Sequence, residues 1–244
     1  MSLNGKVVLI TGAAKRLGRA LALHLAEEGA TIAIHYHSSE KEAENLLRDL
    51  KKKGSQAALF RADLTQVRQI EAMVRKVIKH FGHIDVLINN ASIFFATPFG
   101  KIREKEWDLF METNLKGPFF CTQAVSRYLW KQKKRGSLKV INILDSSGPK
   151  TRGNYLPYWI SKTGLSAMTE TLAGIFSSSR QGSSMSVNAI APGPILFPED
   201  REKFKHEMTI DPFDIVSAVT YLIEDKNAVT GNVLVIDKGR RYLS

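Results

Sequence analysis

The chain has 244 residues, 43% hydrophobic and 24% charged, a composition typical of a soluble globular protein and not of a disordered one. A single cysteine excludes an internal disulfide, and no apolar run is long enough to span a bilayer. The first expected strand begins at Lys6, which leaves no room for a signal peptide, so we expect a cytoplasmic protein. The net charge of +11 would suit nucleic acid, yet no aromatic-interleaved basic stripe accompanies the lysine-rich runs at 51–53 and 131–135, so we expect solvated helix ends and no nucleic-acid partner.

Short apolar runs alternate with amphipathic segments along the whole chain. Strands are expected at 6–11, 31–35, 57–60, 86–89, 138–144, 186–190 and 233–236. Helices are expected at 17–28, 40–53, 66–81, 104–114, 118–133, 157–176 and 214–224. The alternation predicts an α/β fold: a doubly wound parallel sheet with helices on both faces, joined by right-handed crossovers. Because no linker or internal repeat interrupts it, we expect a single domain over 1–244.

A glycine-containing turn directly follows the first expected strand and leads into a helix. It reads Thr11-Gly12-Ala-Ala-Lys15-Arg16-Leu17-Gly18. In a Rossmann-like sheet, such a turn lets backbone N–H groups and the helix N-terminus face a pyrophosphate. The required context of strand, turn and helix is present, so we expect Gly12, Lys15, Arg16, Leu17 and Gly18 to bind a dinucleotide cofactor. The alternative is an ordinary strand-to-helix turn.

The end of the second strand indicates which dinucleotide is used. An enzyme of this fold that uses NAD needs Asp or Glu there, to accept a hydrogen bond from the ribose 2′-hydroxyl. Here the sequence is His35-Tyr36-His37-Ser38-Ser39, with no carboxylate before Glu40. Hydroxyls and imidazoles can donate to a 2′-phosphate, so we expect His37, Ser38 and Ser39 to bind NADPH (or NADP+). If the histidines are merely surface residues, the preference stays open.

Tyr158 and Lys162 are four residues apart, one turn of an expected helix, and therefore lie on the same helix face. A cation beside a phenol favours the phenolate, so we expect Lys162 to lower the pKa of Tyr158 and make it a proton donor and acceptor near neutrality. Asp145 lies thirteen residues before the tyrosine, at the end of an expected strand. It is a candidate partner of the phenol, with hydrogen bonding to local backbone as the alternative.

Together these residues resemble the short-chain dehydrogenase/reductase family along almost the whole chain. The matching motifs, in the family's order and spacing, are Thr11-Gly12 to Gly18, Asp63-Leu64, Asn89-Asn90-Ala91, Thr113-Asn114, Tyr158 with Lys162, and Pro192-Gly193. The resemblance implies a small-molecule substrate and a proton relay in which Tyr158 is the general acid, Lys162 grips the nicotinamide ribose and Asn114 holds a water. It also implies homotetramers, or homodimers, with the helices 118–133 and 157–176 at a subunit interface.

The same resemblance gives the remaining cofactor contacts. Asp63 and Leu64 would bind the adenine. Asn90 and Ala91 would line the cofactor ribose. The segment Pro192-Gly193-Pro194 would bring Ile195 to the nicotinamide carboxamide. No metal is implied.

Three departures from the family pattern resemble pteridine reductases. Arg16 stands at the middle glycine of the phosphate turn, Ser92 at the glycine after Asn-Asn-Ala, and Asp145 at the usual catalytic serine. By this resemblance Phe94 would stack on a pterin ring opposite the nicotinamide, while Arg16 and Ser92 would contact ligand and cofactor phosphates. The alternative for Phe94 is that it merely covers the sheet.

The aspartate suits the reduction of a pterin C=N bond, which requires hydride at carbon and a proton at the neighbouring nitrogen. An Asp–Tyr pair can relay that proton, whereas a serine hydroxyl supplies no titratable group. We therefore expect an NADPH-dependent reductase that acts on a pteridine or dihydropteridine, with Tyr158 and Asp145 as proton donors. One alternative is a carbonyl reductase of the 3-oxoacyl-carrier-protein type, in which Asp145 is tolerated. A second, from another class, is a non-catalytic NADP(H)-sensing binding protein.

Overall fold

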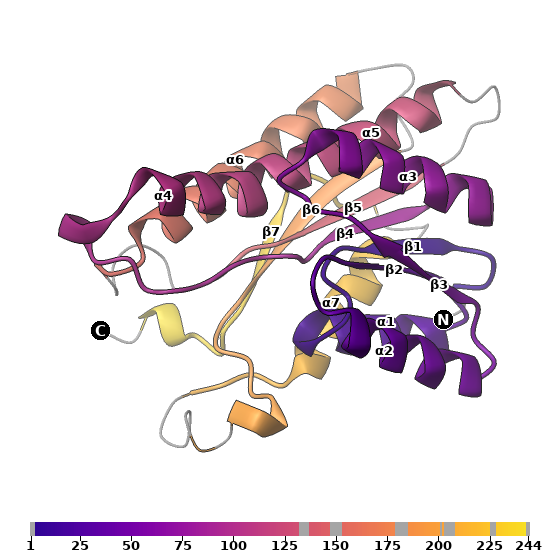
Figure 1. Cartoon of the computed structure of the whole chain (residues 1–244), viewed down its shortest axis with the longest axis horizontal. Coiled ribbons are helices and arrows are strands. Elements are labelled where there is room, and N and C mark those ends of the chain that lie inside the picture. The colour runs from indigo at the N-terminus through magenta and orange to yellow at the C-terminus, as the bar shows by residue number, and fades with distance from the viewer. Residues whose placement is uncertain are drawn as a thin grey trace.

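The computed structural model describes residues 3–131, 137–146, 153–178, 185–200, 202, 208–224 and 228–242. Its strands form one parallel sheet in the order β3-β2-β1-β4-β5-β6-β7 (Figure 1). The strands are β1 Val7–Ile10, β2 Thr31–Tyr36, β3 Ala57–Arg61, β4 Val86–Asn89, β5 Leu138–Ile143, β6 Met185–Pro192 and β7 Val233–Ile236. The helices are α1 Arg16–Glu27, α2 Glu40–Lys52, α3 Val67–Phe81, α4 Glu104–Met111, α5 Gly117–Lys131, α6 Leu156–Ser178 and α7 Pro212–Ile223. The expected doubly wound fold is confirmed, and none of the described helices is long and apolar enough to cross a membrane.

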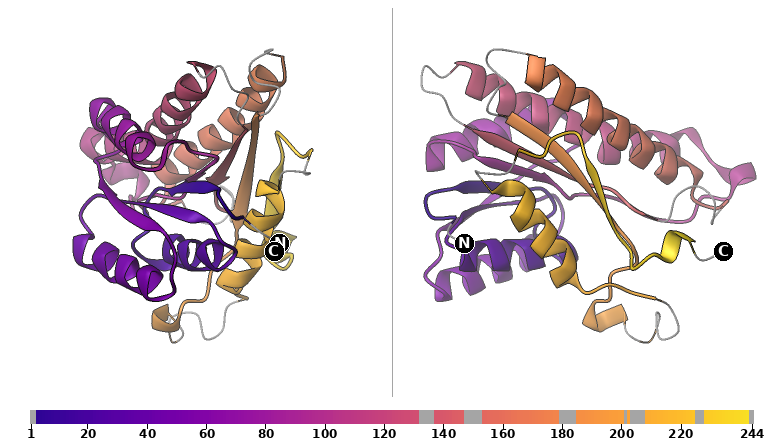
Figure 2. Two further views of the ribbon diagram at one scale, coloured as in Figure 1. Left: turned by 90° about the vertical axis from the view of Figure 1, so that its right-hand side faces the viewer. Right: turned by 180° about the vertical axis from the view of Figure 1, so that it is seen from behind.

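Helices cover both faces of the sheet, α1, α2 and α7 on one face and α3, α5 and α6 on the other (Figures 1 and 2). Successive side chains of a strand point to opposite faces, and both faces are apolar here. In β2, Ile32 and Ile34 pack with the core of the first helix layer, whereas Ala33 packs with the core of the second. This two-sided burial explains why the strands read as continuous apolar runs in the sequence.

One expected feature differs, because no loop separates α4 from α5. A π-helical turn, Glu112–Lys116, connects the two helices into one continuous helical stretch. The sequence predicted two separate helices, 104–114 and 118–133, and Pro118, which has no backbone N–H, lies instead in the first turn of α5, directly after the widened turn. The expected end of this helix at 133, and most of the basic run that ends at 135, lie outside the described residues.

The position of a binding crevice follows from the strand order. The chain leaves β1 for β2 on one side, and β4 then lies against the other side of β1. In open α/β sheets, ligands bind at this switch point, beyond the carboxyl ends of the strands. Every loop that carries an expected site motif leaves the sheet at this edge, as the ends of β1, β2, β3, β4, β5 and β6 show.

Candidate active site

A cavity of about 780 Å³ opens at the carboxyl edge of the sheet. That volume lies within the range of small-molecule and cofactor pockets. Every site residue expected from the sequence lines it except Asn114: the lining includes Gly12, Lys15, Arg16, Leu17, Gly18, His37, Ser38, Ser39, Asp63, Leu64, Asn90, Ala91, Ser92, Phe94, Asp145, Tyr158, Lys162, Pro192, Gly193 and Ile195. Segments from six strand ends thus converge on one cavity.

The turn after β1 fits a pyrophosphate. Gly12 has φ of +62°, and a Cβ added at Gly18 would lie 2.3 Å from the carbonyl oxygen of Gly12, so the turn is too tight for a side chain there. Lys15 precedes α1 in an extended conformation and makes no side-chain capping bond, and the first turn of the helix holds no acidic residue. The uncapped N–H groups at the start of α1 are therefore available to an anion.

Asn90, just after β4, fixes this turn from the other side of β1. Its Nδ2 donates to the carbonyl oxygens of Thr11 at 2.9 Å and Gly12 at 3.1 Å, and its backbone N donates to Thr11 Oγ1 at 2.9 Å. Ala91 N donates to the same hydroxyl at 3.0 Å. The two strand ends that flank the switch point are therefore joined by side-chain as well as backbone hydrogen bonds.

At the expected adenosine end, Asp63 closes the turn after β3. Its Oδ1 accepts from Thr65 N at 2.9 Å and Thr65 Oγ1 at 2.8 Å. Burial opposes ionisation of this carboxyl, but the hydrogen bonds from Thr65 and the nearby imidazoles outweigh it and lower its pKa. Across the cavity mouth, Lys15 Nζ lies 3.4 Å from a carboxylate oxygen of Glu42 on α2. Lys15, expected to bind the dinucleotide, therefore already has a carboxylate neighbour.

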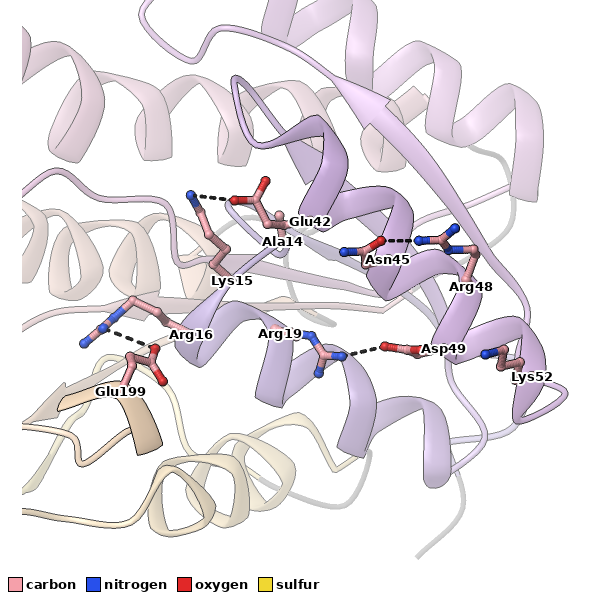
Figure 3. Close-up of a pocket in the computed structure, with 10 residues that line it drawn as sticks. All are labelled: Ala14, Lys15, Arg16, Arg19, Glu42, Asn45, Arg48, Asp49, Lys52 and Glu199. Carbon is pink, nitrogen blue, oxygen red and sulfur yellow. Dashed lines mark hydrogen bonds and ion pairs between the residues drawn. The ribbon is translucent and has the colours of Figure 1, made fainter. Parts of the chain in front are cut away.

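Arg16 has two features that the sequence did not predict. Its φ is +51°, a left-handed conformation that is costly for a residue with a Cβ. Its guanidinium donates to Asp200 at 2.6 Å, lies 3.5 Å from Glu199 (Figure 3), and stacks over the ring of Phe197 at 4.4 Å from the centroid. The side chain expected on ligand and cofactor phosphates is thus bound here by the segment that follows β6.

A second cavity, also of about 780 Å³, extends from Arg16 between α1 and α2. Several cations that line it face carboxylates across it (Figure 3). Arg19 on α1 donates to Asp49 on α2 at 2.6 Å, in addition to the pairs made by Lys15 and Arg16. The pairs of Lys15 and Arg19 join the start and body of α1 to α2, whereas the pair of Arg16 joins α1 to the segment after β6.

Tyr158, near the start of α6, donates its hydroxyl hydrogen to Asp145 Oδ2 at 2.9 Å. Both groups line the cavity, and Tyr158 is 5% exposed. Burial and then the charge of Asp145 raise the pKa of Tyr158 well above its ordinary value. The expected lowering of this pKa by Lys162 was therefore wrong: in this arrangement the phenol stays protonated at neutral pH.

The position of Lys162 explains that difference. Its Nζ donates to the carbonyl oxygen of Ile143 at 2.8 Å and lies 5.7 Å from the centroid of the Tyr158 ring. Four-residue spacing does bring both side chains to the cavity, but the amine donates to a backbone carbonyl and the phenol donates to Asp145. Burial lowers the pKa of Lys162 to about 8, partly opposed by the charge of Asp145.

Asn114 lies in the π-helical turn behind the cavity and is fully buried. Its Oδ1 accepts from Ile93 N at 2.9 Å and Ser92 Oγ at 3.2 Å. Its Nδ2 donates to Ile93 O at 3.1 Å and Ser161 Oγ at 3.2 Å. These four bonds use the full capacity of an amide side chain, so the relay water expected at Asn114 would need its backbone. The extra residue of the π turn aims this amide at the segment after β4.

The far end of the cavity is aromatic. Phe94 stacks on Tyr155 with centroids 4.6 Å apart and an interplanar angle of 5°, and its edge meets Tyr158 at 4.8 Å. Phe94 is 52% exposed, so it does not simply cover the sheet. Tyr155 was missed at the sequence level, where its place three residues before Tyr158 carried no signal. His35 was also missed as a site residue, because a strand-end histidine is indistinguishable from a surface one in the sequence.

The sequence profile described as short chain dehydrogenase matches residues 6–208. The chain therefore belongs to the short-chain dehydrogenase family, whose members are oxidoreductases that use NAD(P)(H). It is similar to two proteins named 3-oxoacyl-[acyl-carrier-protein] reductase FabG. That of Staphylococcus epidermidis is 31% identical over 96% of this chain and 98% of its own length. That of Thermotoga maritima is 33% identical over 98% of this chain and 99% of its own.

Two solved structures show the same fold with a coenzyme. A gluconate 5-dehydrogenase from Burkholderia cenocepacia, in complex with NADP and tartrate, has a TM-score of 0.87 at 26% identity and covers 100% of this chain and 97% of its own. A blue fluorescent protein from a metagenomic library, in complex with NADPH, has a TM-score of 0.86 at 30% identity, covering 98% of this chain and 99% of its own.

Proposed function

We propose that the protein is an NADPH-dependent reductase whose proton donor is the Tyr158–Asp145 pair. The observation that carries the proposal is the 2.9 Å hydrogen bond between these groups inside the cavity that the cofactor motifs line. Burial and the neighbouring carboxylate raise the pKa of this phenol, so at neutral pH it carries the proton that a reduction consumes. This favours the direction of reduction.

The preference for NADPH is supported by the charge around the adenosine end. His37, Ser38 and Ser39 line the cavity there, and Lys15 reaches it from the phosphate turn. No carboxylate from the end of β2 lines this part of the cavity, whereas donors to a 2′-phosphate do. We expect Lys15 to exchange Glu42 for that phosphate when the coenzyme binds, because a dianion is the stronger partner.

The chemistry of the chain's own groups follows from their positions. A bound reduced nicotinamide supplies hydride to the substrate carbon. Tyr158 Oη gives its proton to the neighbouring nitrogen or oxygen, and Asp145, already hydrogen-bonded to that hydroxyl, returns a proton from solvent to the phenol. Lys162 lies on the cavity wall beside this pair, where an ammonium favours the phenolate formed after transfer and can bind ribose hydroxyls.

We propose a pteridine or dihydropteridine as the substrate class. The wall beside Tyr158 is an exposed aromatic ring, Phe94, already stacked on Tyr155, and a flat conjugated heterocycle can stack on its open face. A titratable Asp145 beside the phenol suits protonation of a ring nitrogen. Arg16 and Ser92 are proposed contacts to ligand and phosphate, with Asn90, Ala91 and Ile195 along the ribose and carboxamide.

The second candidate is a 3-oxoacyl thioester, because the relatives described above are named for that reduction. In this case Tyr158 would protonate the carbonyl oxygen, and Asp145 would stand where a hydroxyl serves in the family. The names of these relatives support this substrate more directly than they support a pteridine.

The two substrates are separated by one assay. NADPH oxidation is followed at 340 nm with dihydrobiopterin, with biopterin and with an acetoacetyl thioester, each against NADH as the matched coenzyme control. Turnover of the pterins with NADPH supports the first proposal, and turnover of the thioester alone replaces it with the second. Tight NADPH binding without turnover of any substrate would instead favour a non-catalytic NADP(H) sensor.

We further propose that the chain forms homotetramers through α5 and α6. Phe119 on α5, and Ile160 and Ile175 on α6, are 38%, 38% and 48% exposed, an apolar set on the two long helices. Light scattering checks this directly: a mass of four chains is expected, and a mass of one chain contradicts it.

A further inference from the structure

His35 joins the phosphate turn to the adenosine side of the cavity. It is the fifth residue of β2, is 2% exposed, and points to the same sheet face as Ala33. Gly12 N donates to its Nδ1 at 3.0 Å, and its Nε2 lies 3.0 Å from the carbonyl oxygen of Ala62, the residue before Asp63. Because a carbonyl can only accept, Nε2 carries the hydrogen and Nδ1 is the acceptor. Both ring nitrogens are thus satisfied by one neutral tautomer.

The backbone of the same residue makes a further bond to the turn. Ala13 N donates to the carbonyl oxygen of His35 at 3.0 Å. Two consecutive N–H groups of the turn, those of Gly12 and Ala13, are therefore used by one residue. In the first turn of α1, the N–H groups of Arg16, Leu17 and Gly18 have no partner four residues back within the helix and so remain for an anion.

We infer that His35 is a positioning residue for the dinucleotide: its imidazole consumes the Gly12 N–H, aims the start of α1 at the pyrophosphate, and fixes the distance between that turn and the segment at Asp63. Burial lowers the pKa of His35 to about 4, which keeps the required neutral form at physiological pH. The inference rests on the dinucleotide binding of the proposed function. In this role, the buried His35 determines which backbone N–H groups remain for the coenzyme.

Three substitutions of His35 test the roles of its two ring nitrogens one at a time. His35→Asn keeps an acceptor near the position of Nδ1, His35→Gln keeps a donor near Nε2, and His35→Leu keeps neither. A buried N–H that loses its acceptor costs about 1–3 kcal/mol, which corresponds to a roughly 5- to 150-fold change in an equilibrium constant. We expect NADPH binding, measured by coenzyme fluorescence, to stay within about threefold in the Asn variant and to weaken about tenfold or more in the Gln and Leu variants. His80→Asn, an exposed histidine on α3, is the control for the substitution itself.

Two further readouts distinguish positioning from simple stability. The KM for NADPH should rise in the Gln and Leu variants while kcat at saturating coenzyme changes little, because the proton donors are untouched. In the wild-type protein, the histidine ¹⁵N resonances should report the Nε2–H tautomer, a measurement that needs no variant to fold. Equal NADPH affinity in the folded Asn, Gln and Leu variants, or an Nδ1–H tautomer, overturns the inference. If the wild-type protein binds neither NADPH nor NADH, both the proposed function and this inference are overturned. If it binds NADPH but the Asn variant binds no better than the Gln and Leu variants, only the role of His35 is overturned.

Discussion

The proposed cofactor end and the proposed substrate end of the cavity are built by different kinds of contact. Around the phosphate turn, buried groups and backbone atoms dominate: Thr11, His35 and Asn90 hold the turn through side-chain to backbone hydrogen bonds. At the other end, an exposed Phe94 stacks on Tyr155, and the contacts are between side chains. Replacing Thr11, His35 or Asn90 leaves a backbone group of the turn or of β4 without its partner, whereas replacing Phe94 changes only the wall of the cavity. Coenzyme binding should therefore be the rigid property of this chain and substrate choice the adjustable one.

The difference between the two ends of the cavity is tested most severely by Tyr158→Phe, which should affect turnover and not NADPH binding. We expect turnover to fall roughly 10³-fold, the range associated with loss of a general acid, because the ring stays and only the proton is lost. NADPH affinity should be unchanged, since the ring still fills its place among the buried aromatic residues around it. Steady-state kinetics and a coenzyme titration measure both. Unchanged kcat would contradict the proposed proton donor.

The rigidity of the cofactor end should also appear in its response to acid. The pKa of His35 is about 4 in the folded protein against an ordinary 6.5, so between these values the unfolded chain binds a proton that the folded one does not. Stability therefore falls as pH drops from about 6.5 to about 4, by the order of 3 kcal/mol from this fully buried group, and not further below. His37 and Asp63 lie close enough to modulate the shift.

Denaturant unfolding at several pH values measures this loss. The matched control is His35→Asn, which cannot titrate and should lose less stability over the same interval. Parallel curves for the two proteins would contradict a buried neutral histidine.

At the substrate end, Asp145→Ser tests whether substrate choice depends on this carboxylate. We expect pterin reduction to fall about 10- to 100-fold, because the group that returns a proton to Tyr158 is gone, while reduction of an acetoacetyl thioester is retained. The ratio of kcat/KM for the two substrates is the measurement. Undiminished pterin reduction would show that the carboxylate has no special role.

The smallest effect is expected for Phe94→Ala. Loss of a stacking face should raise the KM for a pterin about tenfold, from an aromatic contribution of about 0.5–1.5 kcal/mol plus lost apolar area. Phe94→Leu, which keeps apolar volume but not the flat face, is the matched control. NADPH affinity should not change in either variant, and a change there would show that the two ends are not separable in this way.

The sequence predicted the fold and nearly all of the cavity because both depend on local patterns. Apolar runs alternating with amphipathic helices determine a parallel sheet, and the sheet brings the ends of its strands to one edge. What could not be predicted depends on distances between segments far apart in the chain. The spacing of Tyr158 and Lys162 gave their shared helix face, but not the Ile143 carbonyl that holds the amine, nor the burial that raises the pKa of the phenol.

The same limit applies to Asn114 and His35. The sequence pointed to Asn114 but not to the widened turn that directs its amide to Ile93 and Ser161. It showed His35 only as a strand-end residue, since its two partners, Gly12 and Ala62, lie 23 and 27 residues away.

Arg16 connects the phosphate turn to the segment that follows β6. Its backbone belongs to the phosphate turn, and its guanidinium is held by Asp200, Glu199 and Phe197 beyond β6. Loss of a charge from that segment would free the guanidinium. Glycine at position 16 would adopt the left-handed conformation at less cost but would leave Asp200 and Glu199 without their cation. A substitution at Asp200 would therefore act on the phosphate turn, although the two residues are 184 positions apart in the chain.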